Sequence, residues 1–245
     1  AVHHHNGGGG RGPALNAGAA AAAGRVITFL HADTTLPDGW DSTILRALDG
    51  EGSVQGGGRT VACAFGFGVH HSDDRDGDTP QPFPPGIPTA VLAANLRCKW
   101  FSLPYGDQAL SVPSSVFRHL GGFPDQSLME DYEFVALLRA RTQWSGEVMA
   151  ALAHAGVHAG MKAAPPEEER GIAILPGRPA LCSVRRWTKF GVPNVTLINS
   201  TLVTLYASGR LTPDKLYRKY YSRACPAREV TESPWEIELA QALTP

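Results

Sequence analysis

The sequence has little of what several large classes of protein require. Its cysteines are few and widely spaced, at Cys63, Cys98, Cys182 and Cys225, and form no Cys-x-x-Cys pair. This spacing is not typical of a zinc site or of a disulfide framework, and it predicts reduced thiols in the core. The 22 basic residues are balanced by 23 acidic ones. Because general nucleic-acid binding needs concentrated positive charge, we expect no nucleic-acid partner.

Long apolar runs are also scarce. The first residues are histidines and glycines, without the apolar stretch of a secretory signal. The best membrane candidate, Val192 to Ser208, is uncharged but rich in Thr, Ser and Asn. It is shorter than the roughly 20 residues of a spanning helix, so we expect a buried or surface-docked helix. The prediction is a cytoplasmic protein without a spanning segment, which leaves peripheral membrane contact open.

What the sequence does contain favours a folded α/β domain. Apolar residues make up 43% of 245 residues, which is enough for a sizeable core. Strand patterns alternate with helical patterns, which predicts a mixed sheet flanked by helices. We expect a disordered lead at 1–12, a single domain at 13–225 and a polar tail at 226–245. Low-complexity insertions are expected near 70–88 and 145–170.

The periodicity and the turn residues place the individual elements. Helices are expected at 13–24, 38–48, 89–101, 114–120, 130–141, 184–190, 192–208 and 212–222. Strands are expected at 25–31, 60–69, 109–112, 172–175 and 180–183. The first strand is expected to be central because it is apolar on both faces. The last two are expected to flank a Pro-Gly turn.

A carboxylate follows the first of these strands directly. The run Phe29-Leu30-His31-Ala32-Asp33 ends an apolar segment in an acid, and Pro37 breaks the chain soon after. One Asp at a strand end can hold Mg²⁺ or Mn²⁺ when phosphates supply the remaining ligands. His31 lies on the same face of an extended strand and could be a second ligand or a phosphate donor. The alternative is that Asp33, Thr34 or Asp38 caps the following helix.

A second acidic pair, Glu130-Asp131, begins a helical pattern after a glycine-rich turn. A carboxylate at that position is well placed to act as a general base. The alternative is that the pair merely complements the dipole of the helix.

Two further polar groups complete the candidate set. Arg185-Arg186-Trp187 combines guanidinium groups, which bind phosphate in a bidentate manner, with an aromatic plane for a sugar. The alternative is a cationic surface turn anchored by Trp187. An acceptor hydroxyl could hydrogen-bond to the polar groups of Tyr105, Asp107 and Gln108. The alternative is that these residues form an ordinary turn.

Taken in order, these motifs resemble those of family 2 glycosyltransferases with the GT-A fold. More narrowly, they resemble the subfamily associated with radical-SAM/selenodomain proteins. The matching segments are Arg11-Gly12, Asn16-Ala17-Gly18-Ala19, residues 29–37, 105–108, 121–124, 129–131, 185–187 and 216–221.

The resemblance implies an inverting transfer of sugar from a nucleotide-diphosphate sugar to an acceptor hydroxyl. Asp33 would correspond to the last acid of the family's Asp-x-Asp motif, with His31 in place of the first acid. Asp131 would correspond to the catalytic base, with Glu130 beside it. Arg186 and Trp187 would lie near the diphosphate and the acceptor. Arg11 and Asn16 belong to the matching lead and are expected to contribute to substrate binding.

The resemblance also marks a departure. The family normally begins with strands that hold the nucleotide base, and these have no counterpart before Arg11. We therefore expect an N-terminally truncated domain. Three explanations are open: the chain is a fragment, a partner supplies the strands, or the protein is an inactive binding or assembly module. A targeting signal could lie in the missing part. A metal-dependent phosphohydrolase built on Asp33 is a third hypothesis, and it would need a further cluster of acids or histidines.

Overall fold

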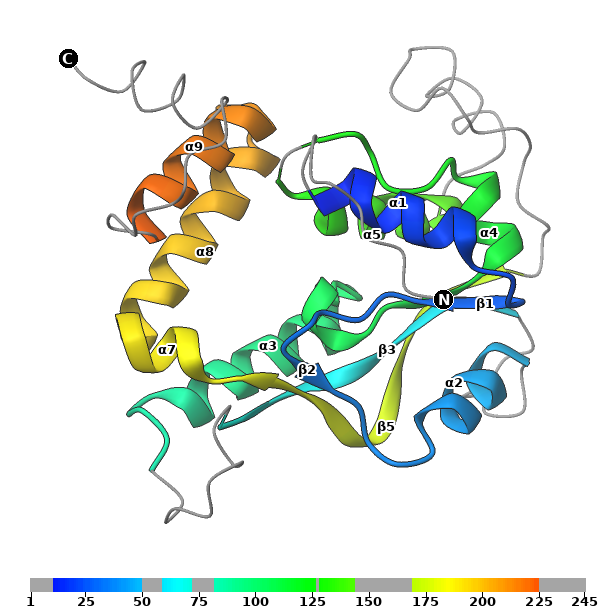
Figure 1. The fold of residues 1–245 in the computed structure, drawn as a ribbon, viewed down its shortest axis with the longest axis horizontal. Coiled ribbons are helices and arrows are strands. Elements are labelled where there is room, and N and C mark those ends of the chain that lie inside the picture. The colour runs from blue at the N-terminus through cyan, green and yellow to red at the C-terminus, as the bar shows by residue number, and fades with distance from the viewer. Residues whose placement is uncertain (1–10, 50–58, 72–81, 127, 144–168, 225–245) are drawn as a thin grey trace.

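The computed structural model describes residues 11–49, 59–71, 82–126, 128–143 and 169–224. These residues form one five-stranded sheet with helices on both faces (Figure 1). The mixed sheet confirms the predicted α/β class and is consistent with a GT-A-like domain. The disordered lead, both insertions and the tail fall largely or wholly outside the described residues.

The sheet has the order β1-β4-β3-β5-β2. Its strands are β1 (Val26–Thr28), β2 (Thr34–Thr35), β3 (Arg59–His70), β4 (Ser111–Pro113) and β5 (Glu169–Ser183). The two long strands, β3 and β5, are parallel, and the other pairs are antiparallel. Because β2 pairs with the end of β5, the segment after β1 is brought beside residues 181–183.

The helices lie close to the predicted ranges. They are α1 (Arg11–Ala21), α2 (Trp40–Asp49), α3 (Ile87–Phe101), α4 (Ser114–His119), α5 (Glu130–Gln143), α7 (Arg185–Phe190), α8 (Val192–Ala207) and α9 (Pro213–Ala224). A short 3₁₀ helix, η1, covers Gly106–Gln108. Within the described residues, no helix combines the length and apolar character needed to cross a bilayer.

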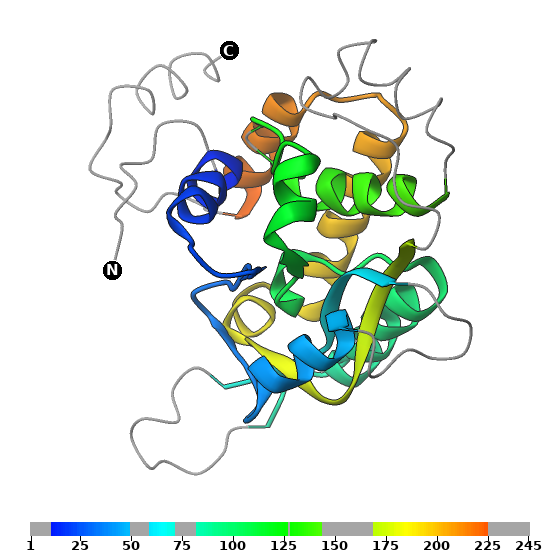
Figure 2. The same ribbon diagram turned by 90° about the vertical axis from the view of Figure 1, so that its right-hand side faces the viewer.

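Two apolar clusters cover the two faces of the sheet. On one face, α1, α4 and α5 pack on Ile27 and Phe29, and Phe29 meets Phe123 edge-on with ring centroids 4.7 Å apart. On the other face, Ile44 and Leu48 of α2 pack against β3 and β5. Figures 1 and 2 show this division, with α2 across the sheet from α4 and α5. The described cysteines are free and buried, as predicted.

The prediction that the first strand is central was wrong. β1 is an edge strand of the sheet that the described residues form, and it pairs with β4. Its apolar character has another cause, because helices cover both of its faces. Ile27 belongs to the cluster with α5, and Val26 packs on the cluster with α2.

The prediction of two strands around a Pro-Gly turn was also wrong. Both segments belong to the single strand β5 and pair with β3 in the same direction. Leu175 pairs with Phe65 and Ala180 with Phe67, so the residues between them form a bulge. Gly177 has a φ of 97° there, a conformation that glycine adopts without a steric penalty.

Candidate functional site

A cavity of about 300 Å³ opens where the sheet, the start of α5 and the helices α7 to α9 meet. Figure 1 shows α7, α8 and α9 following one another along the left side of the molecule. The cavity wall includes eight of the predicted site residues, drawn from segments far apart in the chain. They are Arg11, His31, Asp33, Tyr105, Asp107, Asp131, Arg186 and Trp187.

Asp33 is positioned by the turn between β1 and β2. Its backbone carbonyl accepts a hydrogen bond from the backbone N–H of Ser183 at 2.9 Å, which ties this turn to the end of β5. The side chain is exposed and lines the cavity. The helix-cap alternative was wrong for Asp33 and Thr34, because Thr34 begins β2, Asp33 directly precedes it, and α2 begins only at Trp40.

His31 lies against η1, so close that a side chain at Gly106 would force the His31 ring to shift. A Cβ atom at Gly106 would come within 2.5 Å of His31 Nε2 and 3.4 Å of Asp131 Oδ2. Burial lowers the pKa of His31, and the charge of Arg11 lowers it further, against the opposing effects of Asp131 and Asp33. The ring is therefore neutral at pH 7, the state in which a histidine nitrogen can bind a metal or accept a proton.

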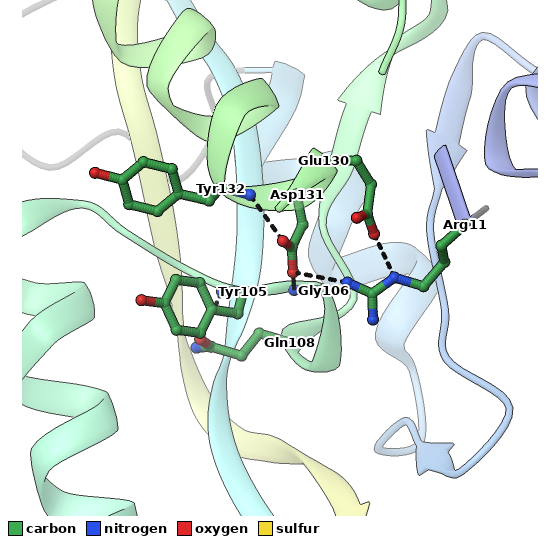
Figure 3. A network of polar contacts seen from close by, with 7 residues as sticks. All are labelled: Arg11, Tyr105, Gly106, Gln108, Glu130, Asp131 and Tyr132. Carbon is green, nitrogen blue, oxygen red and sulfur yellow. Dashed lines mark hydrogen bonds and ion pairs between the residues drawn. The ribbon is translucent and has the colours of Figure 1, made fainter. Parts of the chain in front are cut away.

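Asp131 is held by backbone donors on both carboxylate oxygens. The N–H of Gly106 donates to Oδ2 at 3.2 Å, and the N–H of Tyr132 donates to Oδ1 at 2.8 Å. Arg11 Nη2 lies 3.7 Å from Oδ2. Figure 3 shows the carboxylate between Arg11 on one side and the rings of Tyr105 and Tyr132 on the other. The position of this carboxylate is thus fixed by the fold.

Glu130 is adjacent in sequence but lies elsewhere. Its side chain is fully buried, outside the cavity wall, and pairs with the Nε of Arg11. Burial raises the pKa of Glu130, and the charge of Asp131 raises it further, while Arg11 opposes the shift. The close packing of Gly12 against Pro124 and Glu130 brings Arg11 to this position. The geometry makes Glu130 an anchor for Arg11 and separates it from the cavity.

Three other predicted site residues are also outside the cavity wall. Asn16 exchanges two hydrogen bonds with the backbone of Phe123, at 2.8 and 2.9 Å. Gln108 is fully buried and donates to the carbonyl of Phe65 at 2.8 Å. Arg185 is exposed on α7 and does not line the cavity. Asn16 and Gln108 hold loops that carry other site residues.

Arg186 and Trp187 reach the cavity from α7. The guanidinium of Arg186 lies over the ring of Tyr220 on α9, 4.7 Å from its centroid. Trp187 packs beside Phe67, with ring centroids 5.9 Å apart. Tyr220 lines the cavity as well. It lies in the matching segment 216–221, but it was not among the predicted site residues.

Asp107 has an unusual environment. Its Oδ1 atom is buried and has no hydrogen-bond partner in the structure. Burial, opposed by Arg97 and assisted by Asp131, raises its pKa to about 6. A carboxyl group with a pKa near neutrality in a cavity is a common feature of functional sites.

The described residues contain no cluster of three or more metal-ligating side chains. A dedicated protein cage is therefore not present among them. Mg²⁺, however, is commonly held by one or two carboxylates, with phosphates and waters completing its shell. Asp33, on the cavity wall, fits this second mode, and the nitrogen of His31 on the same wall could add a ligand to Mn²⁺.

The comparisons with known proteins agree with the class of site. A family model described as glycosyl transferase family 2 matches residues 1–100, the part of the chain that carries Arg11, His31 and Asp33. The match supports the resemblance to family 2 glycosyltransferases and a glycosyltransferase activity in general. Asp131 and Arg186 lie beyond the matched residues. Neither a curated protein nor a solved structure matches the chain.

Proposed function

We propose that this protein transfers a sugar from a nucleotide-diphosphate sugar to an acceptor hydroxyl, with inversion at the anomeric carbon. The observation that carries the proposal is the common cavity of Asp33, Asp131 and Arg186. These residues come from the turn before β2, the start of α5 and helix α7, and the family match adds independent support. The motifs also favour the radical-SAM/selenodomain-associated subfamily.

Asp131 is the general base of the proposed reaction. Its carboxylate takes the proton of the acceptor hydroxyl as that oxygen attacks the anomeric carbon. The bond from this carbon to the diphosphate breaks in the same displacement, and the nucleoside diphosphate leaves. A single displacement inverts the configuration. Base catalysis of this kind contributes about 10²–10⁴ in rate.

The leaving group is bound in the same cavity. The fork of Arg186 suits phosphate oxygens, and Trp187 offers an apolar plane beside it. Asp33 and His31 would hold a Mg²⁺ or Mn²⁺ ion there, and the ion would neutralise charge on the diphosphate. The phosphohydrolase hypothesis lacks support, because no further acid or histidine cluster is found among the described residues.

Nucleotide binding tests this proposal. We expect calorimetry to detect binding of UDP or GDP in the presence of Mn²⁺, and we expect Asp33→Ala to weaken it by at least about tenfold because a charged ligand contact is lost. Asp38→Ala is the matched control, since this exposed acid lies outside the cavity wall. No binding heat for the unaltered chain, or equal heats for both variants, would contradict the proposal.

The alternative is an inactive binding or assembly module with the same fold. Such a module would bind UDP or GDP, but it would release no nucleoside diphosphate from a nucleotide sugar at any concentration of acceptor. Detectable sugar transfer by the isolated chain rules it out.

A further inference from the structure

A second cavity, of about 410 Å³, lies between α3 and α8. Its volume is in the range of small-molecule sites. Five residues line both this cavity and the first one, and so form a common wall: Tyr105, Asp107, Trp187, Asn199 and Val203. The two cavities are therefore neighbouring compartments of one larger site.

The lining of the second cavity combines hydroxyl groups with aromatic rings. Helix α8 contributes Thr196, Ser200 and Thr204, and the side chain of Thr204 donates to the carbonyl of Ser200 at 2.8 Å. The aromatic residues Trp187 and Phe67 line it as well. Rings that pack against the C–H face of a sugar, together with side chains that bond its hydroxyls, are the groups that saccharide recognition requires.

Small side chains leave room for this ligand. Helix α3 faces the cavity with Ala90, Ala93 and Ala94. Alanine side chains at these three positions fill little of the space between the two helices. A larger side chain at Ala94 would occupy the volume directly.

The charges of the second cavity favour a neutral ligand. Its cation, Arg97, is already engaged, because its guanidinium lies 3.7 Å from the centroid of the Tyr105 ring and its Nε donates to the carbonyl of Leu103 at 3.0 Å. Asp107 supplies an opposing acid. The first cavity, by contrast, has two cations on its wall: Arg186, and Arg11, which pairs with Glu130 and lies near Asp131. Phosphate groups are therefore better served by the first cavity.

The common wall also connects this cavity to the base. Tyr105 lines both cavities, and the next residue, Gly106, donates its N–H to Asp131. Asp107 on the same wall has an unpaired, buried carboxylate oxygen, and buried polar atoms are normally paired. A ligand hydroxyl could pair with this oxygen while a neighbouring hydroxyl approaches Asp131.

We propose that the second cavity binds the acceptor, and that the acceptor is a neutral saccharide whose reacting hydroxyl reaches Asp131 across the common wall. This inference rests on the proposed function, and it adds the location and chemical class of the acceptor.

The test measures binding of saccharide probes to the full chain by saturation-transfer NMR. The probes are methyl α-D-glucopyranoside, methyl β-D-galactopyranoside and methyl α-D-mannopyranoside, with farnesyl phosphate as an anionic lipid. We expect at least one saccharide to bind, and Ala94→Phe to weaken it by at least about tenfold by filling the cavity. Leu92→Phe is the matched control, since Leu92 lies on the same helix with its side chain exposed and outside the cavity wall.

A second variant keeps the test valid if Ala94→Phe disturbs folding. The double change Thr196→Val and Ser200→Ala removes two hydroxyls from α8 at little change of volume. We expect about three- to tenfold weaker saccharide binding, typical of lost hydrogen bonds. Thr201→Val is its control, because Thr201 does not line the cavity.

The failures of the two proposals can be told apart by measuring nucleotide binding on the same samples. The acceptor proposal is overturned if UDP or GDP binds but no saccharide does, if farnesyl phosphate binds more tightly than every saccharide, or if neither cavity variant weakens saccharide binding. Saccharide binding that responds to Ala94→Phe, in a chain that binds no nucleotide, would support the cavity as a saccharide site and overturn its assignment to an acceptor.

Discussion

The two walls of the first cavity hold their charged groups in different ways. On the sheet side, Asp131 receives two backbone hydrogen bonds, and its neighbour His31 is packed against Gly106. On the helical side, Arg186 is held by stacking over Tyr220, a contact between two side chains. Backbone donors are fixed by the fold, whereas a side-chain stack can part and re-form.

This difference indicates a division of roles. Asp131 is in place before any ligand arrives, which is the preorganisation that catalysis requires. The helical side can adjust to the bound ligand, because a stacking contact contributes only about 0.5–2 kcal/mol. Leu216, which is fully buried against Met129 and Leu202, keeps α9 attached while Tyr220 remains at the cavity.

The largest effect is expected from disturbing the rigid wall. Gly106→Ala would place a Cβ atom 2.5 Å from His31 Nε2, so this ring must shift, and 3.4 Å from Asp131 Oδ2, at the limit of ordinary contact. We expect sugar transfer to fall by about 10², because catalysis tolerates displacements of about 1 Å poorly. Steady-state kinetics measures this.

Gly18→Ala is the control for that change. No atom lies within 4 Å of a Cβ at Gly18, which is exposed on α1. A loss of transfer as large for Gly18→Ala as for Gly106→Ala would show that the wall is not the sensitive element.

A smaller effect is expected from the buried acid of the common wall. Because the pKa of Asp107 is raised to about 6 in the folded protein, the fold binds its proton more tightly than the unfolded chain does. Its contribution to stability is therefore present below about pH 4 and is lost as the pH rises through about 6.

Asp107→Asn should remove this dependence. The free energy of unfolding is measured in denaturant at pH 4 and pH 7. Between these values, the unaltered chain should lose on the order of 2 kcal/mol relative to the variant. Asp38→Asn serves as the reference. Equal pH dependence for the variant and the unaltered chain would refute a raised pKa at Asp107.

The smallest effect is expected on the adjustable wall. Tyr220→Ala removes the ring under Arg186, and we expect transfer to fall by about 2- to 30-fold, the range of a cation–π contact. Tyr220→Phe keeps the ring and should retain most of the rate. If Tyr220→Phe loses as much as Tyr220→Ala, the hydroxyl matters and stacking is not the cause. Both are compared by kcat/KM for the nucleotide sugar.

Much of the fold and part of the site could be predicted from local sequence patterns. Apolar runs and turn residues located the helices and the long strand β3, and the positions of Asp33 and Asp131 at element ends pointed to one cavity. The edge position of β1 and the continuity of β5 depend on long-range pairing with β4 and β3, which local pattern does not encode.

The same limit explains the site residues that were misplaced or missed. Three polar residues of the matching motifs make structural contacts instead. Asn16 hydrogen-bonds to Phe123, Gln108 to Phe65, and Glu130 pairs with Arg11. Polar side chains that support a site and those that line it look alike in a sequence. Tyr220 was missed for the opposite reason, since the packing of α9 brings it to Arg186 from a distant segment.

In the proposed reaction, Asp131 removes a proton from the acceptor in the cavity that it shares with Asp33. The most direct test is the rate of sugar transfer from UDP-glucose, UDP-N-acetylglucosamine and GDP-mannose, compared between the unaltered chain and Asp131→Asn, with Asp125→Asn as a control outside the cavity wall. We predict that Asp131→Asn lowers transfer by about 10²–10⁴ while nucleotide binding stays within about twofold. Transfer by Asp131→Asn at the rate of the unaltered chain would contradict the account.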